Sequence, residues 1–240
     1  MYVFDLVKPG VWLEAVPDPE QARETESLLY LLESSLVDAA LSLWMFDESR
    51  LQVRRPSSPE ERSASRGPDV WRLPTDEALS ARAKWWAEGA VPDAYVHRIP
   101  FLHAKSCLYA LDTIAKAIRL LAGQAGAPET LAALHQELTD ALPALKDVRD
   151  SAHHPEDRVR GRAQQGAKIR PKAIDNAIAK ASEGSALFID TLSGNCYGGT
   201  TADGHYRDVE ISAAVVGFVR DIIQRVHLAY QWKGPVRIVP

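Results

Sequence analysis

Long stretches of helical periodicity constrain the fold of this 240-residue chain more than any other feature. In residues 18–46, apolar side chains recur in steps of three and four, which is the pattern of an amphipathic helix. Asp18 is placed to cap this helix, and Pro19 suits its first turn. The same pattern recurs in residues 100–122, 128–154 and 211–232. Several long helices of this kind predict an antiparallel helical bundle.

Prolines and glycines divide the helical stretches. Pro143 is expected to kink the helix that contains it. Pro155 is expected to end that helix, because the residue before a proline is pushed away from helical geometry. Residues 49–74 are rich in Ser, Pro and Arg without a sustained period, so they predict a long mobile loop. A short helix at 75–90, capped by Thr75, is expected to follow.

The period changes to two near the C-terminal quarter of the chain. Residues 185–200 and 204–212 predict a β-hairpin, joined near an Ala-Asp-Gly turn at 202–204. Residues 174–184, just before it, fit either a short helix or a turn. Residues 1–17 are expected to form a short extended lead. The fold class expected is therefore mainly α, a helical bundle with an appended β-hairpin and a C-terminal helix.

Composition sets the size of the core and the expected compartment. With 46% hydrophobic residues, the chain can bury a core as a bundle at 1–175, on which the hairpin and last helix at 176–240 would pack. No apolar run approaches the roughly 18 residues of a membrane span, and the first ten residues lack a signal-peptide layout. Cys107 and Cys196 are typical of reduced thiols. We therefore expect a cytoplasmic protein without a membrane partner.

The distribution of charge bears on nucleic-acid binding. A net charge of −4 argues against a general nucleic-acid binder, and nothing signals DNA binding. Residues 158–172, however, hold six basic residues and no acid. Such a run is either a solvated loop or a surface that attracts phosphate. The candidate RNA-binding residues in it are Arg158, Arg160, Arg162, Lys168 and Arg170.

The stretch VRDSAHHPEDR at 148–158 carries the clearest chemical signal in the chain. Arg149, the polar Asp150 and His154 follow the order Arg, polar residue, three further residues, His, at the end of an expected bundle helix. Here the chain resembles the HEPN superfamily, the nucleotide-binding domains of higher eukaryotes and prokaryotes. The following Glu-Asp-Arg is similar to the tail of some bacterial members. The resemblance covers about residues 18–165 and implies an all-α bundle.

The resemblance also implies a function, since many HEPN proteins are metal-independent ribonucleases. His154 would then take the proton of an RNA 2′-OH, Arg149 would hold the phosphate, and Asp150 would orient one of these groups. The products would be a 2′,3′-cyclic phosphate and a 5′-OH, and neither a metal nor a cofactor would be needed. Active members pair two copies around one cleft, which predicts a homodimer. A toxin or defence role, with an antitoxin or other protein partner, would follow from the resemblance alone.

Other interpretations of this stretch stay open. Residues five apart on a helix point about 140° from each other, so Arg149 and His154 share a face only if the helix distorts, whereas His153 shares it without distortion. The cluster could instead be a structural helix end, because basic side chains are favoured there. The chain would then be a non-catalytic binding or scaffold protein, or would bind a nucleotide without cleaving it. A zinc site would need a third ligand that no familiar motif supplies.

Two further Arg/His pairs have comparable spacing. Arg98 and His103 flank Pro100, which is expected to break the helix that the family needs. Arg220 and His227 lie on the last helix, after the hairpin, where the family has no motif. The pair at 149 and 154 is therefore the one we expect to function.

Overall fold

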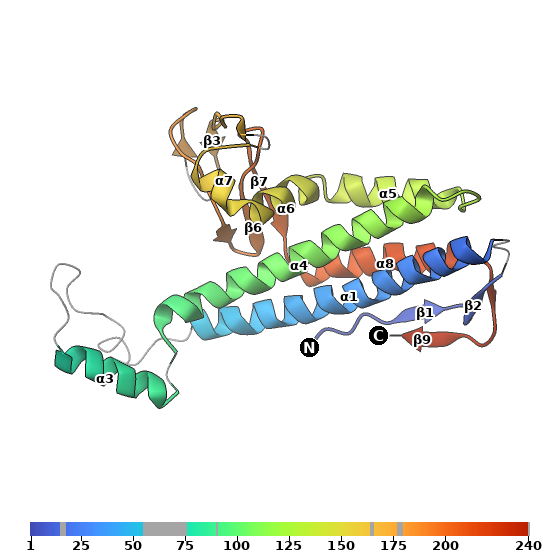
Figure 1. The fold of residues 1–240 in the computed structure, drawn as a ribbon, viewed down its shortest axis with the longest axis horizontal. Helices are drawn as coiled ribbons and strands as arrows, with labels where there is room; N and C mark the ends of the chain where they lie inside the picture. The colour runs from blue at the N-terminus through green and yellow to red at the C-terminus, as the bar shows by residue number, and fades with distance from the viewer. Residues whose placement is uncertain (15–17, 55–75, 90, 164–165, 177–179, 240) are drawn as a thin grey trace.

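The computed structural model describes residues 1–14, 18–54, 76–89, 91–163, 166–176 and 180–239. The chain is mainly helical, with small separate sheets, as the sequence predicts (Figure 1). Helices α1 (Pro19–Arg54) and α4 (Asp93–Ala122) lie side by side along the molecule and make its most extensive contacts. Helices α5 (Thr130–Ala141) and α8 (Ala213–Ala229) pack against each other and complete the bundle.

Helix α1 begins as the sequence predicts. The backbone N–H of Glu20 donates to Oδ1 of Asp18 at 3.0 Å, so Asp18 caps the first turn. The helix is longer than expected, because residues 49–54, which were predicted to belong to a loop, continue it to Arg54. Ser49 is buried and donates to the carbonyl of Phe46, which continues the helical packing. The remainder of that loop, 55–74, lies outside the described residues.

The short helix predicted after the loop is present as α3 (Asp76–Ala87), although its expected cap Thr75 is not among the described residues. Helix α4 corrects a second expectation. It runs unbroken through Pro100, which we expected to break it. A proline inside a helix removes one backbone hydrogen bond, but tertiary packing of an apolar face supplies most helix stability. Pro100 is buried, and the apolar face of α4 packs along α1, which outweighs that loss.

Pro155 acts as predicted, whereas Pro143 breaks the helix that it was expected only to kink. Residues 142–144 form a turn that contains Pro143, and it separates α5 from α6 (Leu145–His153). His154 leaves helical geometry, with φ −121° and ψ 56°, and Pro155 opens the short helix α7 (Pro155–Val159). The helix predicted over 128–154 is therefore two helices with a break at Pro143.

The β-structure is more extensive than the predicted hairpin. Strands β5 (Thr191–Ser193), β6 (Cys196–Thr200) and β7 (Tyr206–Glu210) form an antiparallel sheet in that order. The turn expected at 202–204 does join β6 to β7. Strands β3 (Ile174–Asp175) and β4 (Lys180–Ala181) pair where a short helix or turn was expected. The three-stranded sheet packs on α6, and Arg207 on β7 donates to Asp147 on α6 at 2.6 Å.

The two ends of the chain pair with each other, which the sequence did not indicate. Strand β1 (Leu6–Lys8) pairs with β9 (Arg237–Val239), and β2 (Trp12–Leu13) pairs with β8 (Trp232–Lys233). These ladders lie beside α8 and α1 (Figure 1). The buried side of α8 joins the same hydrophobic core as α1, α4 and α5. The core is thus continuous across the boundary expected at residue 175.

Helix α1 also qualifies the expectation about membranes. Its segment Pro19–Leu51 is long and apolar enough to cross a membrane by length and composition alone. A little under half of its most apolar window is buried inside the bundle, where it packs against α4 and α8. Core helices of soluble proteins pass the same test, so the finding carries little weight for either location.

Candidate active site at the end of helix α6

Arg149 lies where α6 packs on α4, and two carboxylates hold its guanidinium. Its Nε is 2.9 Å from Oδ2 of Asp112, and its Nη1 is 2.8 Å from Oδ1 of Asp150. Asp112 is buried on α4 and also pairs with Nζ of Lys116 at 2.7 Å. The Arg149 side chain is 17% exposed, so it reaches the surface while the two carboxylates hold its guanidinium in place. The predicted Asp150 is thus a direct partner of Arg149.

His153 shares the face of α6 that carries Arg149, as the four-residue spacing requires. Its ring lies edge-on against Tyr109 of α4, with 6.3 Å between ring centroids and 88° between ring planes. Burial raises the pKa of Tyr109, although the nearby charge of Arg149 opposes the rise. His153 is exposed at the surface. The arginine and this histidine therefore belong to one cluster at the α4–α6 interface.

His154 lies beside His153 where the helix ends, and its backbone is non-helical, so the 140° separation of an ideal helix does not apply to it. Its side chain contacts His153 and Glu156. The rings of His153 and His154 lie edge-on, 4.9 Å between centroids. Nδ1 of His154 is 3.4 Å from Oε1 of Glu156, and the side chain is 41% exposed. Both histidines are therefore accessible and adjacent at one helix end.

Three side chains near this end could hold a metal ion by distance alone. The ligand atoms of His154, Glu156 and Asp157 all lie within 4.8 Å of one another. Two of the three are carboxylates, and exposed acidic groups often lie together without an ion. Asp157 also lies 4.0 Å from a nitrogen of Arg160. That the site works without metal remains a prediction, which cleavage in the presence of a chelator would test.

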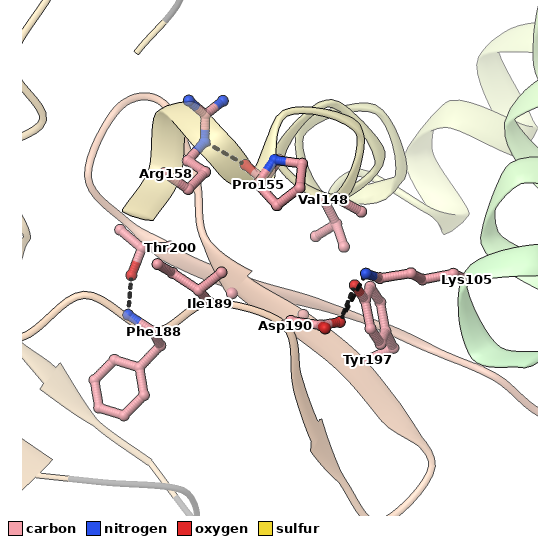
Figure 2. Close-up of a pocket in the computed structure, with 13 residues that line it drawn as sticks. Lys105, Val148, Pro155, Arg158, Phe188, Ile189, Asp190, Tyr197 and Thr200 are labelled. Atoms are coloured by element: carbon pink, nitrogen blue, oxygen red, sulfur yellow. Dashed lines mark hydrogen bonds and ion pairs between the residues drawn. The ribbon is translucent and has the colours of Figure 1, made fainter. Parts of the chain in front are cut away.

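Arg158 does not belong to the expected RNA-binding surface. Its side chain is 2% exposed, and it donates to Oγ of Ser151 at 3.1 Å and to the carbonyl of Arg162 at 2.7 Å. In Figure 2 its guanidinium lies on one side of a small pocket, with Lys105 and Asp190 on the other. Arg158 instead ties α6 to the loop after α7, and this burial removes it from the candidates for RNA contact.

The other basic candidates lie on the loop that follows α7. Arg162 and Lys168 pair in an isolated antiparallel bridge, so these two residues lie side by side. All four remaining side chains are exposed: Arg160, Arg162, Lys168 and Arg170. They are close in sequence to His154, and their contact with RNA remains a prediction.

Sequence reasoning missed a second polar cluster, centred on Asp190 (Figure 2). Asp190 has a positive φ of 56°, which is rare for a residue other than glycine. Its carboxylate accepts from Oη of Tyr197 at 2.7 Å and pairs with Lys105 at 3.1 Å and with Arg98. Burial alone would raise the pKa of Asp190, but these three partners outweigh it and hold the pKa below its ordinary value. The ion pairs of Asp190 with Arg98 and Lys105 hold the segment before β5 against α4.

Helix α4 supplies one side of both clusters. Its polar residues Lys105, Tyr109, Asp112 and Lys116 recur in steps of three and four, so they form a polar stripe beside the apolar face of the helix. That stripe was visible in the sequence and indicates which helix faces Arg149. Asp190 gave no such signal, because it lies in an irregular segment far along the chain.

Comparisons of the chain with models of known protein families, with curated proteins and with solved structures give no match.

Proposed function

We propose that this chain is a metal-independent endoribonuclease of HEPN type. The observation that carries the proposal is the placement of Arg149 and His153 beside Tyr109, with His154 beside His153, at an accessible helix end. Asp112 and Asp150 hold Arg149 in place. The rings of His153 and His154, four and five residues further along the chain, lie edge-on to each other. An imidazole titrates near neutral pH, and a guanidinium binds phosphate, so these are the groups that RNA cleavage needs.

His154 is the proposed base. Its Nδ1 faces Glu156, which leaves Nε2 for the substrate. Nε2 takes the proton of a 2′-OH, and the 2′ oxygen then attacks the adjacent phosphorus. The bond from phosphorus to the 5′ oxygen breaks, and that oxygen takes a proton from His153, which enters the step as an imidazolium and leaves it as a neutral imidazole. The products are a 2′,3′-cyclic phosphate and a 5′-OH, and the reaction consumes no metal, oxidant or cofactor.

Arg149 is proposed to stabilise the charge that develops on the phosphate oxygens. Its two ion pairs engage Nε and Nη1, and Nη2 takes part in neither, so one edge of the guanidinium remains for substrate. The exposed cations after α7 would extend the contact along the RNA backbone. A homodimer that faces two such clusters, a cytoplasmic toxin or defence role, and an antitoxin or other protein partner are proposed from the family resemblance.

One observation favours a second candidate, a non-catalytic binding protein. Arg149 already pairs with two carboxylates, and a phosphate must share it with them. In that case the cluster holds α6 on α4, and the chain binds RNA or a protein without cleaving it.

Cleavage of a mixed RNA pool in EDTA separates the two candidates. The wild type, Arg149→Ala, His153→Ala and His154→Ala are compared, with His97→Ala, an exposed histidine of α4, as a matched control. The ribonuclease proposal expects cleavage by wild type and control, and its loss in Arg149→Ala, His154→Ala and His153→Ala, since these remove the phosphate-binding cation, the base and the acid. If a folded wild-type dimer cleaves no RNA in this assay, the ribonuclease proposal is rejected and the binding function remains.

A further inference from the structure

A recess of about 200 Å³ lies beside the break between α5 and α6, against α4. The break at residues 142–144 interrupts what would otherwise be one helix, and Leu142 and Pro143 line the recess. Three helices therefore contribute its walls. The polar side chains around it are Asp112, Lys116, Arg119, His135, Thr139, Lys146 and Arg149.

The charge of this recess is strongly one-sided. Four of its lining residues are cations, Lys116, Arg119, Lys146 and Arg149, against the single acid Asp112. The charge of Asp112 is already matched twice, by Arg149 at 2.9 Å and by Lys116 at 2.7 Å. Arg119 forms no ion pair with any of the described residues. Asp150, beside the recess, pairs with Lys146 at 3.0 Å and with Arg149 at 2.8 Å. Four cations therefore stand against two carboxylates, and Arg119 is the cation whose charge no described carboxylate matches.

The remaining lining gives the recess an apolar floor and two neutral polar groups. Leu138, Leu142 and Leu145 form the floor. Burial lowers the pKa of His135, and the charge of Arg119 lowers it further, so the ring is neutral at pH 7 and offers both a donor and an acceptor. Such a lining suits a ligand with a strongly charged end and a small organic part.

Size narrows the ligand further. Drug-sized ligands occupy pockets of roughly 300 to 1,000 Å³, so this recess is too small for them and for a base-paired duplex. It has room for a phosphate group and part of a sugar. A phosphate monoester carries about −1.5 to −2 charges at pH 7 and three strong acceptor oxygens, which matches several converging cations better than a singly charged diester does.

We propose that the recess between α4, α5 and α6 binds a phosphate monoester, held by Arg119 with Lys116, Lys146 and the pocket edge of Arg149. The monoester is either the terminal phosphate of an RNA strand or that of a small phosphorylated metabolite. The inference rests on the recess itself and does not require that the chain cleaves RNA. If it also cleaves RNA, Arg149 lies between the phosphate recess and the histidines, and would couple recognition of an RNA end to cleavage.

Isothermal titration calorimetry at physiological salt tests the proposal with defined probes. These are inorganic phosphate, glycerol 3-phosphate, and a 2′-O-methyl octanucleotide with a 5′-phosphate, with a 3′-phosphate or with neither. The 2′-O-methyl groups remove the nucleophile, so binding is measured whether or not the protein is a nuclease. Arg119→Gln removes the recess cation that forms no ion pair with the described residues. Arg237→Gln, which changes an exposed arginine on β9, is the matched control.

The expected result is binding that requires the phosphate and weakens by about tenfold in Arg119→Gln but not in Arg237→Gln, as the loss of one charge-assisted contact predicts. Preference for a phosphorylated oligonucleotide over glycerol 3-phosphate identifies an RNA end as the source, and the reverse identifies a metabolite. Equal affinity for all oligonucleotides with no binding of the small phosphates would overturn the proposal, as would an unchanged affinity in Arg119→Gln.

Discussion

His227 makes the stability of this protein depend on pH in a way that can be calculated. The ring lies fully buried on α8, and neither of its nitrogens makes a hydrogen bond with the described residues. Burial, with a smaller effect of the Lys8 charge, lowers the pKa of His227 from 6.5 to about 4. Glu33 lies 3.4 Å from its Nε2 and favours the charged ring, but Glu33 is shared with Lys8 at 3.0 Å. The neutral ring is therefore the folded form.

The sign and size of this pH dependence follow from the linkage between proton binding and folding. The unfolded chain binds a proton at His227 near pH 6.5 and the folded chain only near pH 4, so stability is fully present above 6.5 and falls as the pH drops between these values. The difference of 2.5 units (6.5 − 4) corresponds to about 3.4 kcal/mol in total, of which roughly 2.4 kcal/mol is lost between pH 7 and pH 4.5.

Urea unfolding at several pH values measures this loss. Carboxylates contribute to acid destabilisation as well, so the informative quantity is the difference between wild type and His227→Leu, which cannot titrate at this position. The free energy of unfolding of wild type minus that of His227→Leu should fall by about 2 kcal/mol between pH 7 and pH 4.5. Ile223→Val, at a buried neighbour on the same helix, should cost about 1 kcal/mol at every pH. Parallel curves for wild type and His227→Leu would refute the reasoning.

Three further perturbations test the packing around the candidate site. Arg158→Ala should destabilise the chain by about 2 to 4 kcal/mol in thermal unfolding, because it empties the space of a buried side chain and removes its hydrogen bonds to Ser151 and the Arg162 carbonyl, and a loss under 1 kcal/mol would contradict this role. Asp190→Ala should be less stable than Asp190→Asn by about 1 kcal/mol, since Asn tolerates a positive φ. The excess stability of wild type over Asp190→Asn should disappear as the pH falls below about 4, because the lowered pKa of Asp190 gives stability only to the ionised form. Gly198→Ala should abolish the native near-ultraviolet circular dichroism, because a Cβ there would collide with the backbone of β7, and a native spectrum would exclude that collision.

Local chemistry explains which parts of the fold the sequence predicted. The Asp18 cap and the effects of Pro143 and Pro155 depend on residues a few positions apart, and all three are observed, although Pro143 breaks its helix instead of kinking it. Pro100 was misjudged because its helix is stabilised by packing along α1, which no local pattern reports. The terminal strands were missed because Leu6 pairs with Val239, at the opposite end of the chain.

The candidate site shows the same division between local and distant information. Spacing along one helix placed Arg149 with His153 and named Asp150 as a partner. The second partner of Arg149, Asp112, comes from another helix, and the burial of Arg158 depends on how the loop after α7 folds back. A run of basic residues reports charge but not exposure, so one member of the expected surface is internal.

In the proposed reaction, His154 and Arg149 cleave RNA through its own 2′-OH. The most direct test is mass spectrometry of the products from a short RNA incubated in EDTA, beside the same sequence with 2′-O-methyl groups. We expect fragments that end in a 2′,3′-cyclic phosphate and begin with a 5′-OH, from unmodified RNA only. Cleavage of the 2′-O-methyl strand, or fragments with a 5′-phosphate and a 3′-OH, would contradict the claim, because either requires a nucleophile other than the 2′-OH.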